Sequence, residues 1–279
     1  MQAGVFAKTF RGTDPATVLA AAKTAGFDLV QYNMACSGLS SLPLEVTADV
    51  ATAIAAAAAD QGVQIAAVSA TYNMVHPSPE RREQGRRAAA AIAGHADLIG
   101  TRLMTLCSGS ADPIDQWRHH PENASPSSWR QLLREFEYLV QLAERYDLVL
   151  CVEPESANVV SSAPAARLLV DTLRTDRVGI ILDPANLFEV ADAGRRQYLI
   201  EEAVDLLADR IVLAHAKDRY PDGTVAPAGE GIIDFDHFLR SLRAGGFDGP
   251  LIAHGFEEPD AAAVAAFLNS HLRQLEPVA

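Results

Sequence analysis

Four residues that can bind a metal ion each stand at the end of a short apolar segment in the second half of the chain. They are Glu153, Asp183, His215 and His254. If these segments are parallel strands of one sheet, their carboxyl ends meet at the same rim and the four side chains converge. Two carboxylates and two imidazoles suit a divalent transition metal better than calcium. The sequence therefore predicts a site for one divalent metal ion.

The segments that end in these residues belong to a longer series. Eight short apolar segments alternate with longer amphipathic, alanine-rich segments. The eight begin near Gly4, Asp28, Val63, Arg102, Leu148, Val178, Arg210 and Pro250. Repeated strand–helix units with continuous apolar strands indicate a parallel sheet buried on both faces. Eight such units predict a single α/β domain over residues 1–279, a (β/α)8 TIM barrel with outer helices.

The helix limits support this count. Asp14 and Ser125 each precede a proline, the arrangement of an N-cap followed by a proline in the first turn. Asp234 opens the segment 235–244, and Pro259-Asp260 opens the last helix. Glycines such as Gly26 and Gly62 stand where a helix hands over to the next strand, as C-terminal glycines do.

The longest irregular stretch runs from Cys107 to Ser125 and follows the fourth candidate strand. A loop of this length in a compact domain is usually functional or disordered, and its tryptophan and two histidines favour function. Trp117 and His120 are therefore candidate substrate contacts, although Trp117 could instead anchor the loop. His76, just past the third strand, is a third candidate. Arg219 could reach a carboxylate or phosphate, but a lone loop arginine is more often a surface residue.

Two further candidates are expected on the same face of their strands as the predicted ligands. Glu155 and Lys217 each follow a predicted ligand, Glu153 and His215, by two residues and so point the same way. Glu155 could bind substrate hydroxyls or stand in solvent. Lys217 could polarise a carbonyl or pair with Asp218.

Composition excludes several classes of partner. The net charge is −13, which disfavours nucleic acid because binding rests on basic side chains that neutralise phosphates. The three cysteines show no disulfide spacing, and neither a signal peptide nor a membrane span is evident. We expect a cytoplasmic protein with a small-molecule partner and no membrane partner. Barrels of this kind often pair, so a homo-oligomer stays open.

Several short segments are typical of one family. They are residues 71–77 (TYNMVHP), 106–110 (LCSGS), 152–155 (VEPE), 182–187 (LDPANL) and 215–218 (HAKD). With their order and spacing, the chain resembles the sugar phosphate isomerase/epimerase family, the xylose-isomerase-like TIM barrels. In that family a Glu, an Asp, a His and a second Glu on the last four strands bind one metal. The resemblance implies that Glu153, Asp183 and His215 are ligands of one ion among Mn, Zn, Co, Fe and Mg, with Mn favoured.

The fourth ligand departs from the family pattern. The family usually reads Gly-x-Leu-x-x-Glu on the last strand, and here His254 occupies the glutamate position. A histidine can bind the metal, and Glu257 is an alternative ligand further along the loop. Family epimerases use two metal-bound glutamates on opposite faces of the substrate. Asn186 stands where some members carry a histidine, and it can bind a hydroxyl but cannot carry protons.

The resemblance implies a divalent-metal-dependent isomerase or epimerase that acts on a sugar or keto-polyol through an enediolate. Glu153 is the candidate base and His254 the second acid/base, and Trp117 would stack on the sugar ring. A lyase or dehydratase that eliminates from a keto-sugar or keto-glycoside is the alternative. A metal-dependent hydrolase like the apurinic-site endonucleases fits the acidic charge less well, and a non-catalytic binding barrel is the last alternative. No glycine-rich phosphate cradle is evident, which favours a non-phosphorylated substrate.

Overall fold

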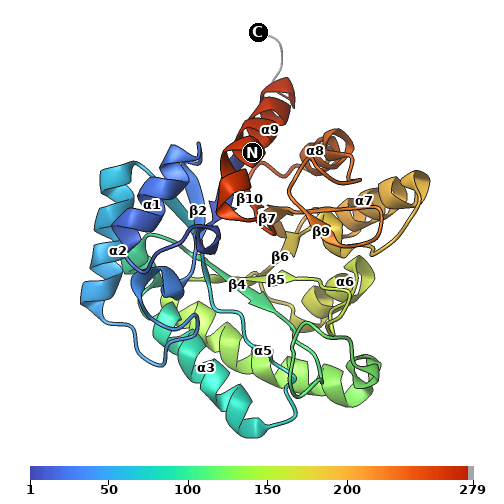
Figure 1. Ribbon diagram of the computed structural model, residues 1–279. Coiled ribbons are helices and arrows are strands. Elements are labelled where there is room, and N and C mark those ends of the chain that lie inside the picture. The colour runs from blue at the N-terminus through green and yellow to red at the C-terminus, as the bar shows by residue number, and fades with distance from the viewer. Residues whose placement is uncertain (276–279) are drawn as a thin grey trace.

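Eight parallel strands form a closed barrel in the computed structural model, which describes residues 1–275 (Figure 1). They are β1 (Gln2–Phe6), β2 (Leu29–Tyr32), β3 (Gln64–Ser69), β4 (Leu103–Cys107), β5 (Val149–Glu153), β6 (Val178–Leu182), β7 (Ile211–Ala216) and β10 (Pro250–Ala253). Strands that follow one another in the sequence are neighbours in the barrel, and β1 pairs with β10 to close it. The predicted TIM barrel is confirmed.

The helices surround the barrel (Figure 1). They are α1 (Pro15–Thr24), α2 (Ala48–Gln61), α3 (Pro79–Ala93), α4 (Ala96–Ile99), α5 (Pro126–Tyr146), α6 (Ala163–Leu173), α7 (Ala193–Leu207), α8 (Phe235–Ala244) and α9 (Ala261–Leu275). The side chains of Asp14, Ser125 and Asp234 each accept a hydrogen bond from the backbone N–H three residues later, which confirms these predicted helix starts. No helix within residues 1–275 is long and apolar enough to cross a membrane.

The inside of the barrel is filled by six apolar side chains from six strands. They are Leu29, Ala67, Cys151, Ile181, Leu213 and Ile252. Because side chains alternate along a strand, the residue two places further along also points inward, nearer the carboxyl end. Those next positions are all polar: Gln31, Ser69, Glu153, Asp183, His215 and His254. A polar layer therefore lies directly above the apolar layer, at the end where TIM-barrel enzymes bind their substrates.

Two features were not expected from the sequence. A two-stranded antiparallel hairpin, β8 (Asp218–Arg219) and β9 (Val225–Ala226), follows β7. The segment Cys107–Ser125 contains a 3₁₀ helix, η3 (Pro121–Ala124), and is held by a buried asparagine. Asn123 Oδ1 accepts a hydrogen bond from the Ala111 N–H at 2.8 Å, and its Nδ2 donates to the Ala157 carbonyl at 2.7 Å.

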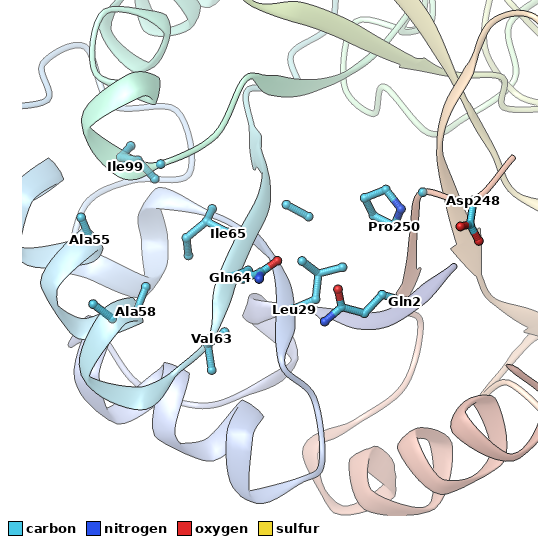
Figure 2. Close-up of a pocket in the computed structure, with 14 residues that line it drawn as sticks. Gln2, Leu29, Ala55, Ala58, Val63, Gln64, Ile65, Ile99, Asp248 and Pro250 are labelled. Carbon is cyan, nitrogen blue, oxygen red and sulfur yellow. The ribbon is translucent and has the colours of Figure 1, made fainter. Parts of the chain in front are cut away.

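A cavity of about 550 Å³ lies at the amino-terminal end of the barrel, where strands begin (Figure 2). Gln2, Leu29, Gln64 and Pro250 line it together with alanines of α2. It contains none of the predicted site residues. The candidate functional site therefore lies at the opposite end of the barrel, where the polar layer is.

Candidate metal centre and its cavity

The four predicted ligands converge at the carboxyl end of the barrel. One ligand atom from each of Glu153, Asp183, His215 and His254 lies within 4.8 Å of the other three. Ligands that share one ion stand at ~2.0–2.2 Å from it, so this spacing is close to that of a metal centre. Glu257, the alternative fourth ligand, is exposed and is not part of this group.

The hydrogen bonds of His215 leave one ring nitrogen free for a ligand role. Gln31 Nε2 donates to Thr105 Oγ1 at 3.2 Å, which turns Gln31 Oε1 toward His215 Nε2 at 3.1 Å. In the neutral imidazole this places the proton on Nε2. The Nδ1 lone pair then faces Glu153 Oε1 at 3.0 Å and Asp183 Oδ2 at 3.9 Å. Acceptors that face one another without a proton between them fit a shared cation, and metal-binding histidines are normally oriented by such a partner.

Asp183 is held at both carboxylate oxygens. Its Oδ1 accepts from the Ala185 N–H at 2.9 Å, and its Oδ2 lies 3.0 Å from Lys217 Nζ and 3.2 Å from His254 Nε2. Burial raises the pKa of Asp183, but Lys217 and His254 outweigh it, so the pKa lies below its ordinary value. The side chain is therefore an anion of fixed orientation.

Glu153 has one carboxylate oxygen, Oε2, that makes no hydrogen bond or ion pair within residues 1–275. All its carboxylate contacts within residues 1–275 are made by Oε1, which accepts from Asn186 Nδ2 at 2.8 Å and faces His215. Burial raises the pKa of Glu153, but the contact with His215 and the nearby charge of Lys217 outweigh that effect, so the pKa lies below its ordinary value. Oε2 is left available to accept a proton from a substrate.

Lys217 is a buried cation within the centre. Its Nζ donates to Asn186 Oδ1 at 2.7 Å in addition to its ion pair with Asp183. Burial lowers the pKa of Lys217, but Asp183 and Glu153 raise it above its ordinary value, so the ammonium stays charged. Within residues 1–275, Lys217 makes no ion pair with Asp218, the alternative partner that the sequence suggested, and pairs with Asp183 instead.

Asp218 has a different role. It is fully buried, and its carboxylate accepts from four backbone N–H groups. The donors are Arg219 and Ile233 to Oδ1, and Gly229 and Gly231 to Oδ2, at 2.8–3.1 Å. This residue ties the loop after β7 into one piece beside Lys217.

His254 belongs to the candidate metal centre and is partly exposed. Its side chain is 21% exposed, and its ring lies edge-on to that of His215 with centroids 4.4 Å apart. Burial lowers the pKa of His254, and His215 lowers it further, so the ring is neutral despite its contact with Asp183. A neutral imidazole is the form that binds a metal.

The next residue, Gly255, has a φ of +84°, a conformation that favours glycine. A Cβ atom here would lie 2.8 Å from Val225 Cγ1 of the hairpin and 3.1 Å from Lys217 Cγ. Gly255 thus gives Lys217 and the hairpin the space to lie against the metal centre.

A cavity of about 400 Å³ opens above the centre, and we call it the mouth cavity. Glu153, Glu155, His215, His254 and Trp117 border it. The polar side chains of this lining that were not predicted from the sequence are Lys8, Gln31, Asn33, Ser41, Ser69, Thr71 and Gln116. Burial and the neighbouring Glu153 raise the pKa of Glu155 to about 8. Half-exposed Trp117 stands at the rim, as a residue that stacks on a substrate would.

Asn186 and Lys217, described above, and three further predicted substrate contacts bond to the protein itself and do not border the mouth cavity. His76 Nε2 lies 3.1 Å from the Pro113 carbonyl, and its Nδ1 accepts from the Ser78 N–H. His120 Nδ1 accepts from the Glu122 N–H and caps η3. The guanidinium of Arg219 donates to two backbone carbonyls and links neighbouring loops. Substrate contact by these three side chains stays a prediction.

Comparisons with known proteins agree with this architecture. A solved structure of the 3-keto-D-glucoside 4-epimerase YcjR from E. coli aligns with a TM-score of 0.77 at 17% identity, covering 97% of this chain and 99% of that one. A D-allulose 3-epimerase from Methylomonas sp. aligns at 0.75 with 15% identity, covering 98% and 97%. A xylose isomerase domain protein from Planctomyces limnophilus aligns at 0.74 with 20% identity, covering 98% and 96%.

At these identities the structural likeness establishes the fold. No curated protein matches the sequence. A family model described as xylose isomerase-like TIM barrel, however, matches residues 19–272, which is nearly the whole described chain. The chain therefore belongs to the xylose isomerase-like TIM barrel family.

Proposed function

We propose that this protein is a divalent-metal-dependent isomerase or epimerase of a sugar or keto-polyol. The observation that carries the proposal is the convergence of Glu153, Asp183, His215 and His254 beneath a polar mouth cavity. Two of the structural relatives described above are named as sugar epimerases, which supports the same class of substrate. A small-molecule partner fits the enclosed site, and the acidic charge argues against nucleic acid.

The residues of this chain divide the work in the proposed reaction. Glu153 Oε2 faces the cavity and would remove the proton from the carbon beside the substrate carbonyl. His254 borders the same cavity and would return or donate a proton, whereas Asp183 lies beneath and serves as a ligand alone. Asn186 and Lys217 hold Glu153 and Asp183 in place.

The donor set of two carboxylates and two imidazoles fits a divalent transition ion, and we favour manganese. Bound among these four residues, the ion would supply polarisation of the substrate carbonyl and so acidify the adjacent C–H bond. Trp117 would cover the ring and exclude water from one side of it.

A lyase is the second candidate, and the replacement of the usual glutamate by His254 favours it. Epimerisation by two carboxylates needs a base on each face of the substrate. Here the candidate ligands that border the mouth cavity are one carboxylate, Glu153, and two imidazoles, His215 and His254. A carboxylate base and an imidazole acid also suit elimination, in which the base removes the α-proton and the acid protonates the leaving group.

The first experiment tests the metal centre with Glu153→Gln. We expect the wild-type protein to bind about one divalent ion per chain and to exchange a substrate C–H for deuterium in D₂O. Glu153→Gln should lose most bound metal and reduce exchange by ~10²–10⁴-fold, the usual contribution of a general base. Metal content is measured by mass spectrometry and exchange by NMR with a panel of ketoses and 3-keto-glucosides.

Glu257→Gln is the matched control, because Glu257 is an exposed glutamate on the same loop as His254. It should keep both metal and exchange. Full metal occupancy in Glu153→Gln would contradict the assigned centre. Product analysis separates the two reactions: a diastereomeric sugar supports the epimerase, and an eliminated product supports the lyase.

A further inference from the structure

A second cavity adjoins the mouth cavity, with a volume of about 510 Å³. Both cavities border Thr71 and Gln116, and the adjacent residues Ser41 and Ser40 face the mouth cavity and the second cavity respectively. The loops after β2, β3 and β4 thus form a border that the two cavities share. A molecule bound at the metal centre that extends beyond one ring would enter the second cavity.

The lining of the second cavity combines apolar surface with polar groups. Leu42, the half-exposed Leu44 and the Tyr72 ring supply the apolar part. Arg81 and Gln84 of α3 supply hydrogen-bonding groups, as does Gln116. Sugar rings present apolar C–H faces together with hydroxyl edges, and binding sites for them combine these two kinds of surface.

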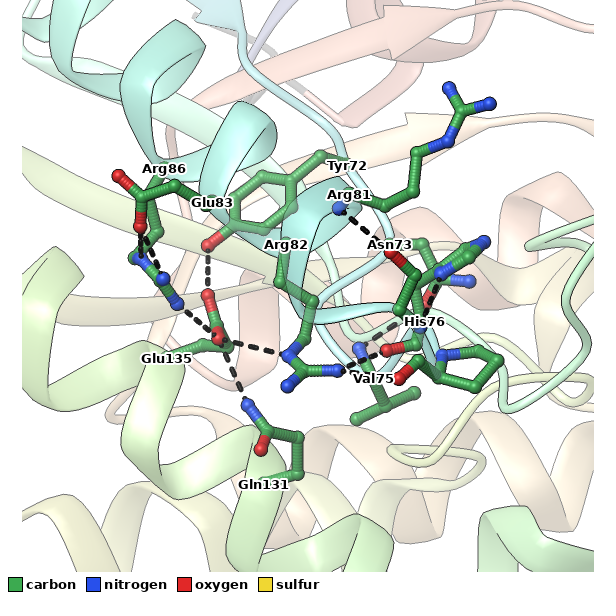
Figure 3. A network of polar contacts seen from close by, with 12 residues as sticks. Tyr72, Asn73, Val75, His76, Arg81, Arg82, Glu83, Arg86, Gln131 and Glu135 are labelled. Carbon is green, nitrogen blue, oxygen red and sulfur yellow. Dashed lines mark hydrogen bonds and ion pairs between the residues drawn. The ribbon is translucent and has the colours of Figure 1, made fainter.

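Three polar side chains that line the second cavity are free to bind a ligand. Within residues 1–275, no hydrogen bond or ion pair is made by the side chains of Arg81, Gln84 or Gln116. The neighbouring arginines behave differently: Arg82 and Arg86 turn toward the buried Glu135, whereas Arg81 points away from that network (Figure 3). Arg81 is thus a cation of a strongly acidic protein, and it has no carboxylate partner in the part of the chain that the structure describes.

The wall of the second cavity is held in place by the Glu135 network. Tyr72 Oη donates to Glu135 Oε2 at 2.8 Å, and Arg86 Nη1 donates to Oε1 at 2.7 Å (Figure 3). Arg82 Nε lies 3.6 Å from Glu135 Oε1, and Arg82 Nη1 donates to the His76 carbonyl. Gly85 packs against the Tyr72 ring so closely that a Cβ atom would lie 2.1 Å from it. The loop from Tyr72 to His76 is therefore fixed, and the cavity exists before a ligand arrives.

We propose that the second cavity binds a second sugar ring, so that the substrate is a disaccharide-sized keto-glycoside whose reacting ring lies in the mouth cavity. The proposal rests on the proposed function for the position of the reacting ring. One arginine and two amides beside two leucines fit hydroxyl groups. A phosphate group is normally bound by several cationic side chains that converge on it. The lining offers the cation Arg81, and the nearby His76 is already hydrogen-bonded to the protein.

Binding is the first test, because it does not depend on turnover. Disaccharides of α and β linkage are titrated calorimetrically into the metal-loaded protein beside the methyl glycosides of the same ring. We expect at least one disaccharide to bind about tenfold more tightly than its methyl glycoside. Arg81→Ala should remove this preference, because loss of one hydrogen bond from a charged donor lowers the affinity for the disaccharide about tenfold. Ser40→Trp should remove it by filling the cavity.

Arg87→Ala is the matched control, because Arg87 is an exposed arginine on the same helix that does not line the cavity. It should keep the preference. Equal binding of disaccharides and methyl glycosides, or a preference that survives Arg81→Ala and Ser40→Trp, would overturn the second-ring site. Absence of deuterium exchange with 3-keto forms of both sugars, while the binding preference persists, would overturn the proposed function and leave the second-ring site standing.

Discussion

At the scale of single residues, the polar layer contains the four candidate metal ligands together with side chains that orient them, such as Gln31. Carboxylates and imidazoles at strand ends attract notice because they can bind metals. Gln31 and Ser69 are equally part of the polar layer, but an amide or hydroxyl within a strand has many structural roles. Their signal was the two-residue step from an interior apolar residue, which becomes visible once the strands are known. The sequence did not reveal that Lys217 pairs with Asp183. Its sequence neighbour Asp218 was the obvious candidate, but backbone N–H groups that are brought in by the tertiary structure bind the Asp218 carboxylate.

Gln31 gives the prediction at this scale. Gln31→Leu removes the acceptor that places the His215 proton on Nε2, so metal affinity should fall ~10–100-fold, as for other losses of a ligand's orienting partner. Competition with a fluorescent chelator measures the affinity. Gln31→Glu restores an acceptor oxygen and should bind metal more tightly than Gln31→Leu.

Gln64→Leu serves as the control, because Gln64 is an exposed glutamine at the opposite end of the barrel. If Gln31→Leu binds metal as tightly as Gln64→Leu does, the orienting role assigned to Gln31 is wrong.

At the scale of elements, the strands and the capped helix starts were predicted because they carry strong local signals. An apolar run and an aspartate or serine before a proline can be recognised without the fold. The hairpin β8–β9 was missed because strands of two residues have no periodicity to detect. The loop that contains it owes its form to Asp218 and the backbone N–H groups around that side chain.

Asp218→Asn tests that loop. Asparagine keeps one acceptor oxygen and turns an NH₂ group toward backbone donors, so buried N–H groups lose their partner. We expect the free energy of unfolding to fall by about 2–3 kcal/mol. Chemical denaturation measures the change, and hydrogen exchange should speed up at Gly229, Gly231 and Ile233.

Asp205→Asn, on the exposed side of α7, is the control and should unfold like the wild type. Unchanged stability and exchange in Asp218→Asn would show that the loop does not depend on this carboxylate.

At the scale of the whole molecule, counting strand–helix units was sufficient to predict a closed barrel. The pairing of β1 with β10 completes the closure, and it requires close contact at Gly4. A Cβ atom at this position would lie 2.7 Å from both Ile252 Cδ1 and the Leu29 carbonyl oxygen. The assembly of the molecule and the cavities between its loops depend on such distant contacts, which the sequence alone does not reveal.

Gly4→Ala should therefore destabilise the barrel by about 1–3 kcal/mol, the usual cost of overpacking. Gly194→Ala is the matched control, because Gly194 lies in the first turn of α7 with its nearest contact at 3.6 Å. That variant should be as stable as the wild type or more stable, by up to ~1 kcal/mol. Urea unfolding of the two variants gives the comparison, and equal stabilities would refute the close packing at β1.

The space left by Gly255 also has an evolutionary consequence. A larger residue there would push on both Val225 and Lys217 and would force a strained backbone. We therefore expect substitutions of His254, which borders the mouth cavity, to be tolerated better than substitutions of Gly255. Diversification of this protein should proceed by changing position 254 while position 255 stays constant, and directed evolution of the rim should leave Gly255 out of its libraries.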